Sequence, residues 1–475
     1  MATKNRWFIP TNLDNLKMII AQGLISSPDG FKKYYKDVLE YIPGYIPILK
    51  NKIQQDILKS VTSEVDGLIP CILEIEIGMI DGVVKELENN SLVDIAIENV
   101  DSSSNEVFFI QAPLPLGIIS KVIFRTSAEK NAFEKDATLY SNVPLSSLTM
   151  HYTKTDQKLF ENNDKLIDES LVSLDTFKSI DPGEVPQIDY KKIYAFGGML
   201  INLFYFSKNG QTSNDIFMRA IGNNPSEADD ESIILDWFDV KTSENEVSIN
   251  HILYNGLVKA AVEADDFKES IITFLDSNEK TRSIAQKMID FESASDKPVS
   301  EYFKEAKTRY GKALLMLFVR EDSDALIDYE LDIFDEHDYL VFAMLFGIRD
   351  KFIKVPKFIR EFEGLQNFVT IKMANYAHHS VNSSVSFKEP KIPLTVVNML
   401  KNNRFKEFIA KELKMEHCFQ TIIPSSDYTV KKGKPILPGI VMPKFEILED
   451  AYFDFMSKYK LLDYNKFLKK YEKIR

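Results

Sequence analysis

The sequence predicts an α+β N-terminal domain followed by a predominantly helical region, and three observations support this division. Residues 71–77, CILEIEI, alternate in the manner of a half-buried strand. The run VFFIQAPLPLGIISKVIFRT supplies two further apolar, β-branched stretches that are separated by Pro113 and Pro115. From about residue 190 to 375, strand patterns are few, and stretches such as NHILYNGLVKAAVEA space their apolar residues as helices do.

The first expected helix lies in the opening stretch RWFIPTNLDNLKMIIAQGLI, residues 6–25. Thr11, with Asp14 three residues on, predicts a cap for a helix over residues 11–24, and Gly23 predicts its end. The expected apolar face consists of Leu13, Leu16, Ile19 and Ile20. A second short helix is expected in GFKKYYKDVLEYIPGYIPIL, before the turn at Pro43 and Gly44.

Breaks in these patterns predict four segments. Residues 1–160 form the α+β domain, and residues 161–189 form an acidic linker that contains the breakers DPGEVP and buries little. Residues 190–375 form the helical domain. The polar stretch YAHHSVNSSVSFKEPKIPL then opens a C-terminal helical portion, 376–475, which ends in a basic helix. No repeat of fixed period is present, which disfavours a solenoid or propeller.

Composition narrows the classes of function. The chain has 475 residues, of which 58 are basic and 71 acidic, so its net charge is -13 and it repels phosphate backbones and anionic membranes. Only 10 of the basic residues are Arg, the side chain best suited to bidentate base recognition. Direct sequence-specific nucleic-acid binding is therefore disfavoured. The Lys-rich, Asn-rich usage is typical of an AT-rich, bacterial genome.

Cysteine usage and the N-terminus point to the cytoplasm. Cys71 and Cys418 are far apart and lack neighbouring Cys or His at ligand spacing, which disfavours zinc ribbons and a disulfide framework. The first residues lack the apolar run of a signal peptide, and no stretch reaches about 18 uninterrupted apolar residues. We expect a cytoplasmic protein without a membrane span.

No motif with a self-evident catalytic mechanism is present. The sequence contains no GxxxxGK[ST], GxGxxG after a strand, HExxH or GxSxG. The Glu-x-Lys triplet of magnesium-dependent nucleases occurs three times, as Glu305 with Lys307, Glu389 with Lys391, and Glu412 with Lys414. Chance explains such matches in a chain rich in Glu and Lys, so a magnesium nuclease is the third choice.

The opening stretch resembles the start of DNA-targeting mono-ADP-ribosyltransferase toxins, in which an Arg or His precedes a short helix that ends in GLI. This resemblance implies that Arg6 anchors NAD and that Tyr35, or its neighbour Tyr34, stacks on the nicotinamide. It also implies that Glu74 or Glu76 stabilises an oxocarbenium-like centre. The Ser/Thr-Ser-Thr/Ser triplet of such folds is missing between these positions. On residue pattern alone, both carboxylates fit the solvent face of a strand equally well.

The histidines do not predict a metal site. His378 and His379 form the one cluster, and adjacent residues point about 100° apart on a helix and to opposite faces on a strand. Loop polarity is the preferred explanation for this pair. The stretch DEHDYLVFAMLFGIRD is expected to be a core helix.

The C-terminal 18 residues carry seven basic and two acidic side chains, a local charge of +5 on an acidic protein. Lys466, Lys469, Lys470 and Lys473 are the candidate partner-binding residues, because they surround one apolar helical face. A packed terminal helix with a solvated basic rim is the alternative.

These observations favour a cytoplasmic, bacterial, non-catalytic interaction or sensor subunit of a multi-protein system. Antiviral defence systems contain many subunits of this kind, and that step is an analogy. A protein partner is expected, with neither a cofactor nor a metal. The alternative is an NAD-dependent ADP-ribosyltransferase-like enzyme that acts from the N-terminal domain.

Overall fold

The computed structural model describes residues 5–26, 42–62, 67–139, 153–161, 173–208 and 363–388, with scattered residues between 269 and 349 and between 430 and 435. The chain divides into two compact units. The first comprises residues 1–190, 360–390 and 421–443, and the second comprises residues 191–359, 391–420 and 444–475. Each unit therefore combines segments that are distant in the sequence.

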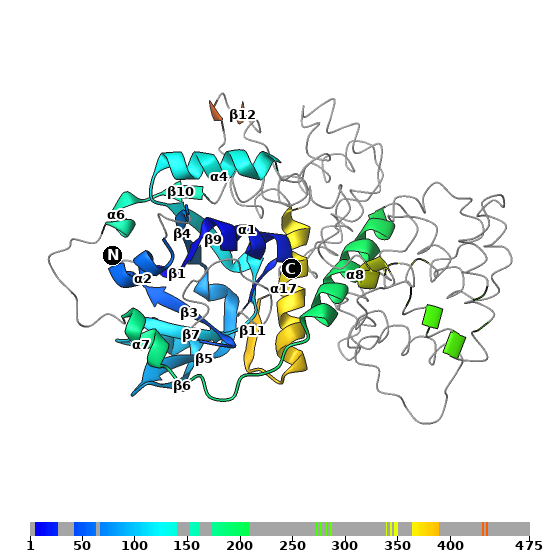
Figure 1. The fold of residues 1–475 in the computed structure, drawn as a ribbon, viewed down its shortest axis with the longest axis horizontal. Coiled ribbons are helices and arrows are strands. Elements are labelled where there is room, and N and C mark those ends of the chain that lie inside the picture. Colours follow the sequence, from blue (N-terminus) through cyan, green and yellow to red (C-terminus); the bar gives the residue numbers. More distant parts are fainter. Residues whose placement is uncertain are drawn as a thin grey trace, which may run out of the picture. The chain divides into compact units, whose positions relative to one another are not determined.

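A mixed nine-stranded sheet forms the centre of the first unit (Figure 1). Its strands are β1 (Trp7–Asn12), β3 (Tyr45–Lys50), β4 (Pro70–Ile75), β5 (Ile80–Glu88), β6 (Ser91–Ala96), β7 (Val107–Gln111), β9 (Ile119–Phe124), β10 (Thr153–Thr155) and β11 (Val385–Phe387). The order is β10-β9-β4-β1-β3-β7-β5-β11, and β6 pairs with β5. Among the pairs of named strands that the structure describes in this sheet, β9 with β10 is the one parallel pair. The predicted α+β character of the N-terminal region is confirmed.

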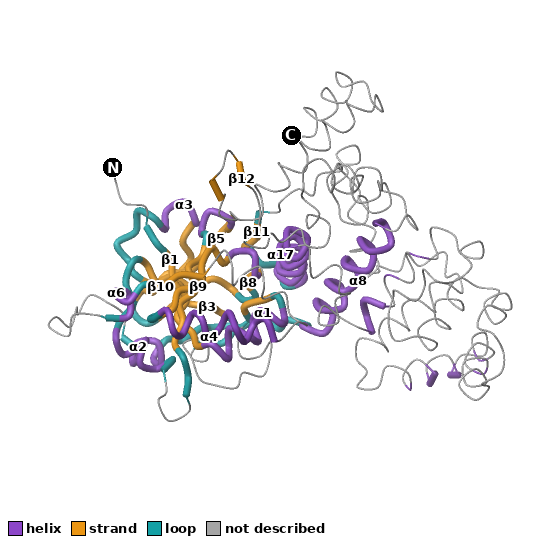
Figure 2. Tube along the Cα trace, turned by 90° about the horizontal axis from the view of Figure 1, so that it is seen from above, coloured by secondary structure: helices purple, strands orange, loops and turns teal. Residues whose placement is uncertain are grey.

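Helices and short strands surround this sheet, which lies at the centre of the unit in Figure 2. The helices are α1 (Leu13–Gln22), α2 (Gln55–Ser60), α3 (Ile97–Val100), α4 (Ser127–Leu139), α6 (Gln157–Phe160), α7 (Leu174–Ser179) and α17 (Glu363–Ser380), with 3-10 turns η3 (Ile77–Met79) and η4 (Leu116–Ile118). Two small pairs complete the strands, β2 (Leu24–Ile25) with β8 (Leu114–Pro115), and β12 (Val430–Lys431) with β13 (Lys434–Pro435).

The opening of the chain forms a strand before it forms a helix. The predicted apolar face of α1 is buried, and Gly23 ends the helix in the left-handed region with φ 74°. The cap differs from the prediction, because Thr11 lies in β1 and the side-chain oxygen of Asn12 accepts the hydrogen bond from the Asn15 backbone N–H at 2.9 Å. The stretch WFIPTN was not expected as a strand.

Strand β4 corresponds to the predicted strand at 71–77, yet it is not half-buried. All six of its residues are buried. It pairs with β1 on one side and with β9 on the other, so it is a central strand covered on both faces. The acidic positions of CILEIEI therefore do not mark a solvent face along the whole strand.

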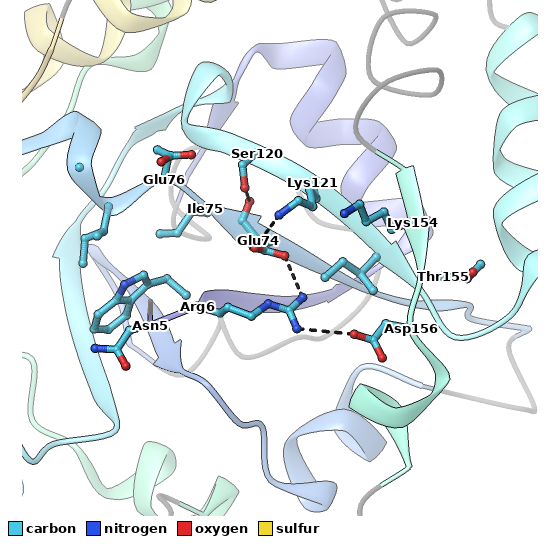
Figure 3. A pocket seen from close by; sticks show the side chains of 14 residues that line it. Asn5, Arg6, Glu74, Ile75, Glu76, Ser120, Lys121, Lys154, Thr155 and Asp156 are labelled. Atoms are coloured by element: carbon cyan, nitrogen blue, oxygen red, sulfur yellow. Dashed lines mark hydrogen bonds and ion pairs between the residues drawn. The ribbon is translucent and has the colours of Figure 1, made fainter. Parts of the chain in front are cut away.

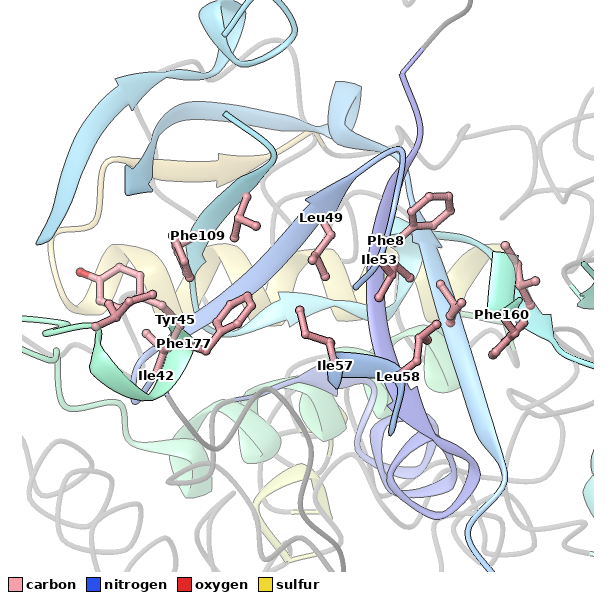
Figure 4. Close-up of a cluster of buried hydrophobic side chains, with 14 residues drawn as sticks. Phe8, Ile42, Tyr45, Leu49, Ile53, Ile57, Leu58, Phe109, Phe160 and Phe177 are labelled. Atoms are coloured by element: carbon pink, nitrogen blue, oxygen red, sulfur yellow. The ribbon is translucent and has the colours of Figure 1, made fainter. Parts of the chain in front are cut away.

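One face of the sheet is covered by α2, α6 and α7 (Figure 4). The strands contribute Phe8, Leu49, Ile72, Phe109 and Ile123 to this core, and the covering elements contribute Ile53, Ile57, Leu58, Phe160, Phe177 and Ile180. The rings of Phe109 and Phe177 meet edge to face, with their centroids 6.1 Å apart. On the opposite face, Phe133 of α4 packs against Phe124 of β9.

The core includes residues from the stretch expected as an acidic linker. Phe177 is fully buried and Ile180 is 6% exposed, so residues 173–180 belong to the first unit instead of connecting two domains. The physical reason is spacing, because two apolar residues three positions apart lie on one side of a helical turn and can face the sheet. The acidic side chains around them dominate the composition and hide this pattern.

The expected boundary at residue 376 also differs from the structure. Helix α17 continues to Ser380, and β11 pairs with β5 in the sheet of the first unit. Gly82 permits this pairing, since its φ is 102° and a Cβ there would lie 1.8 Å from the Ser384 carbonyl oxygen. His378 is 1% exposed in the last turn of α17, so the loop interpretation of this residue was wrong.

In the second unit, α8 (Tyr190–Lys208) is an apolar helix whose described side chains are buried from Ile193 onward. The described residues within 190–375 are all helical, and the rest of that stretch lies outside the described residues, so the predicted helical domain stays a prediction. The expected helix before Pro43 and the expected basic terminal helix also lie outside them. Among the helices that the structure describes, none combines the length and apolar character needed to cross a bilayer.

Candidate functional site

A pocket of about 510 Å³ lies at the end of the sheet face that α2, α6 and α7 cover. It is bounded by β4, β9, β10 and the residues that lead into β1 (Figure 3). Its volume lies within the range of about 300–1,000 Å³ that small-molecule sites occupy. Six charged side chains line it: Arg6, Glu74, Glu76, Lys121, Lys154 and Asp156.

Strand alternation brings Glu74 and Lys121 to the same face. They are directly paired in the register of β4 and β9, and Phe8 of β1 lies opposite Glu74 on the other side. Arg6 precedes Phe8 by two residues, so it lies on the same face. Its guanidinium carbon lies 4.8 Å from the centre of the Phe8 ring.

Two cations hold the Glu74 carboxylate. Arg6 Nη2 lies 2.9 Å from Oε2, and Lys121 Nζ lies 2.8 Å from Oε1, so each carboxylate oxygen has its own charged donor. Burial alone would raise the pKa of Glu74, but the hydrogen bonds from Arg6 and Lys121 outweigh it and hold the pKa below its usual value. The same hydrogen bond to Glu74 raises the pKa of Arg6.

The main chain fixes the position of Arg6. Its backbone N–H donates to Asn51 Oδ1 at 2.9 Å, and its carbonyl oxygen accepts from the Asn51 N–H at 2.8 Å. Asn51 follows β3 with φ 62°, a conformation that Asn tolerates better than most residues. Arg6 Nη1 also lies 3.5 Å from Asp156 Oδ2. The guanidinium is therefore held by two carboxylates and an aromatic ring.

The structure brings three of the sequence-predicted residues to one pocket. Arg6, Glu74 and Glu76 all line it, as the transferase resemblance requires. Glu76 is exposed, and Figure 3 shows its carboxylate pointing away from the Arg6–Glu74 pair. Tyr34 and Tyr35 lie outside the described residues.

The other sites predicted from the sequence involve residues that the structure does not describe. The four tail lysines, Lys466, Lys469, Lys470 and Lys473, and the three Glu-x-Lys pairs lie outside the described residues. Within the described ranges, no group of three His, Cys, Asp or Glu side chains is arranged to hold a metal ion.

Sequence reasoning missed Lys121, Lys154 and Asp156. Lys121 carried a usable signal, because it is the one charged side chain inside the apolar run GIISKVIF. A charge at that position of a strand needs a partner on the same face. Lys154 and Asp156 carried no signal, since HYTKTDQ is an ordinary polar stretch and only the pairing of β10 with β9 places it at the pocket.

A second polar cluster surrounds His378 and connects α17 to the strands. His378 Nε2 lies 3.0 Å from the Pro113 carbonyl oxygen, and Nδ1 lies 3.0 Å from Ser383 Oγ. The Ser383 hydroxyl also lies 3.1 Å from Gln111 Oε1. Burial lowers the pKa of His378 to about 4, against the opposing effect of the hydrogen bond to Pro113. The imidazole is therefore neutral at physiological pH, and its hydrogen bonds connect α17 to Pro113 and Ser383.

The pocket is better suited to holding charged groups than to nucleophilic chemistry. Its described lining contains no imidazole or thiol, and its hydroxyls are those of Ser120 and Thr155. Ser120 Oγ donates to the Glu74 carbonyl oxygen at 3.0 Å, so that hydroxyl is not paired with a base. In comparisons with known proteins, no protein-family model, no curated protein and no solved structure matches this chain.

Proposed function

We propose that this chain is a non-catalytic interaction or sensor subunit of a cytoplasmic, bacterial multi-protein system, and that the pocket beside Arg6 is its recognition site. The observation that carries the proposal is the neutralisation of Glu74 by Arg6 and Lys121. A general acid or base works best with a pKa near the operating pH. The lowered pKa of Glu74 keeps it ionised and paired instead.

The makeup of the chain supports the same conclusion. The described pocket lining offers no nucleophile with a neighbouring base, and the sequence has none of the nucleotide-hydrolysis or zinc-protease motifs. Multi-protein systems, including those of antiviral defence, use such subunits to receive a signal and pass it to a partner. This last step rests on analogy.

The test is to purify the full-length chain from its host under native conditions and assay it. A stoichiometric protein partner should co-elute in size-exclusion chromatography, and the complex should release no nicotinamide from NAD above the buffer rate. A chain that elutes alone and turns over NAD contradicts the proposal.

One observation favours a second candidate, an NAD-dependent ADP-ribosyltransferase-like enzyme. Arg6, Glu74 and Glu76 converge on one pocket of suitable size. In that case Arg6 would anchor NAD after releasing its long contact with Asp156, and the exposed Glu76 would face the reacting centre. Glu74 fits this role less well, because both of its oxygens are already occupied.

A matched pair of variants tests this second candidate. Glu76→Gln should abolish nicotinamide release, whereas Glu88→Gln, an exposed carboxylate at the end of β5, should not change it. Equal rates for the two variants, or no release by the unaltered chain, would remove the enzyme from consideration.

A further inference from the structure

Lys154 differs from the other cations of the pocket. Arg6 and Lys121 each form an ion pair with Glu74, while the exposed Lys154 ammonium has no hydrogen bond or ion pair with any described residue. It nevertheless lines the pocket. An unpaired ammonium that lines a pocket is available to a ligand.

Strand pairing places Lys154 beside Lys121. In the parallel register of β10 and β9, Lys154 lies opposite Ile123, and Lys121 lies two residues before Ile123 on the same face. Diagonal neighbours of this kind have Cα atoms about 7–8 Å apart, within reach of two long side chains. In Figure 3 both ammonium groups point toward the same side of the pocket. One small anionic group can therefore contact both lysines.

The charges around this position set the kind of anion. Arg6, Lys121 and Lys154 balance the carboxylates of Glu74, Glu76 and Asp156, so the pocket is locally neutral on a protein whose net charge is -13. Asp156 is about one third exposed, and Glu76 is exposed at the pocket. These carboxylates repel a polyanion, and they can accept hydrogen bonds from a ligand's hydroxyl or amine groups.

We propose that the pocket binds a small ligand through one anionic group, a carboxylate or a phosphate, seated between Lys121 and Lys154. Hydroxyl or amine donors on the same ligand face Asp156. The Glu74 carboxylate holds Lys121 and Arg6 in place through its two ion pairs and does not contact the ligand. The biological role of this binding, though not the binding itself, rests on the proposed sensor function.

The experiment uses the full-length chain, with inorganic phosphate, acetate and tripolyphosphate as probes at constant ionic strength. Thermal denaturation monitored by circular dichroism reports binding as a rise in melting temperature. Lys154→Gln removes the unpaired ammonium, and Lys158→Gln removes an exposed ammonium from α6 outside the pocket. Phosphate or acetate should bind about tenfold more weakly to Lys154→Gln, because a charge-assisted hydrogen bond is lost, and equally well to Lys158→Gln.

The three probes and the two lysine variants distinguish the possible outcomes. Binding of phosphate alone identifies a phosphate-bearing ligand, and binding of acetate alone identifies a carboxylate. The site is refuted if neither anion binds, if both variants bind alike, or if tripolyphosphate binds more tightly than phosphate. Nicotinamide release by a chain with Lys154-dependent anion binding would overturn the sensor function and leave the anion site standing.

Discussion

The same three strands carry two different surfaces on one face of the sheet. Phe8, Ile72 and Ile123 lie in the apolar core beneath α2, α6 and α7. Two residues away from these, toward one end of the sheet, the same face presents Glu74, Lys121 and Arg6, which directly precedes β1, to the pocket. Alternation decides which face a side chain occupies, and the covering helices decide whether that position must be apolar.

The apolar end and the charged end of this sheet face are stabilised by different forces. Complete burial of a large apolar side chain contributes about 1.5–3 kcal/mol, and its removal also leaves a cavity. The ion pairs at the other end contribute less per contact, because Arg6 and Lys121 are 41% and 31% exposed and solvent screens them. Substitutions at the apolar end should therefore cost more stability.

Phe177→Ala tests the apolar end and should have the largest effect. The side chain is fully buried against Phe109, so its loss should lower the free energy of unfolding by about 3–5 kcal/mol. Urea denaturation monitored by circular dichroism measures this loss. Lys178→Ala, an exposed neighbour on α7, should stay within about 0.5 kcal/mol of the unaltered chain. A small effect of Phe177→Ala would show that residues 173–180 act as a linker and do not contribute to the core.

His378 extends the comparison to a buried polar group whose hydrogen-bond partners, Pro113 and Ser383, are uncharged. Its pKa of about 4 in the folded chain lies below the ordinary value of 6.5, so the unfolded chain binds the proton first. Its contribution to stability is complete above pH 6.5 and decreases as the pH falls to about 4, by about 3 kcal/mol in total.

Unfolding free energies measured in urea between pH 7 and 4 should reveal this dependence. His378→Gln should be less stable at pH 7 and should lose less stability on acidification. His379→Gln removes the exposed neighbour and should keep the pH slope of the unaltered chain. Identical slopes for all three proteins would show that His378 is not the responsible group.

Glu74→Gln tests the charged end and should cost less than the apolar substitution. It leaves Arg6 and Lys121 without their shared carboxylate, which should lower stability by about 1–3 kcal/mol at pH 7. Because the pKa of Glu74 is lowered, its contribution is present above the unfolded value of 4.5 and is lost as the pH falls through the folded value. The variant and the unaltered chain should therefore converge in acid. Glu76→Gln, an exposed control, should remain within about 0.5 kcal/mol.

The smallest effect on stability is expected in the basic tail. The sequence predicts that Lys466, Lys469 and Lys470 lie on a solvated rim, so replacing them by Glu should change the melting temperature little, since exposed charges contribute about 0–1 kcal/mol per pair. If the tail docks a partner, the triple variant should recover less of that partner in a native pull-down, most clearly at low salt. Unchanged recovery at low salt would assign partner binding elsewhere.

Much of the local structure could be predicted from the sequence. The apolar face of α1 and the glycine at its end follow from spacing within about ten residues, as do β7 and β9 on either side of Pro113 and Pro115. The strands β1 and β3 and the helix α7 were missed, because each is short and carries Pro or an acidic neighbourhood. Their conformation comes from partners that local patterns do not contain.

The sequence by itself determined composition, charge and these local elements, and it marked Arg6, Glu74 and Glu76 as candidates. Only the tertiary structure decided that Glu74 is neutralised, that Lys121, Lys154 and Asp156 complete the pocket, and that β11 joins the N-terminal sheet. The reason is sequence separation. Arg6 meets Glu74 across 68 residues, and His378 meets Pro113 across 265. Such pairs are set by strand order and packing, which no local periodicity encodes.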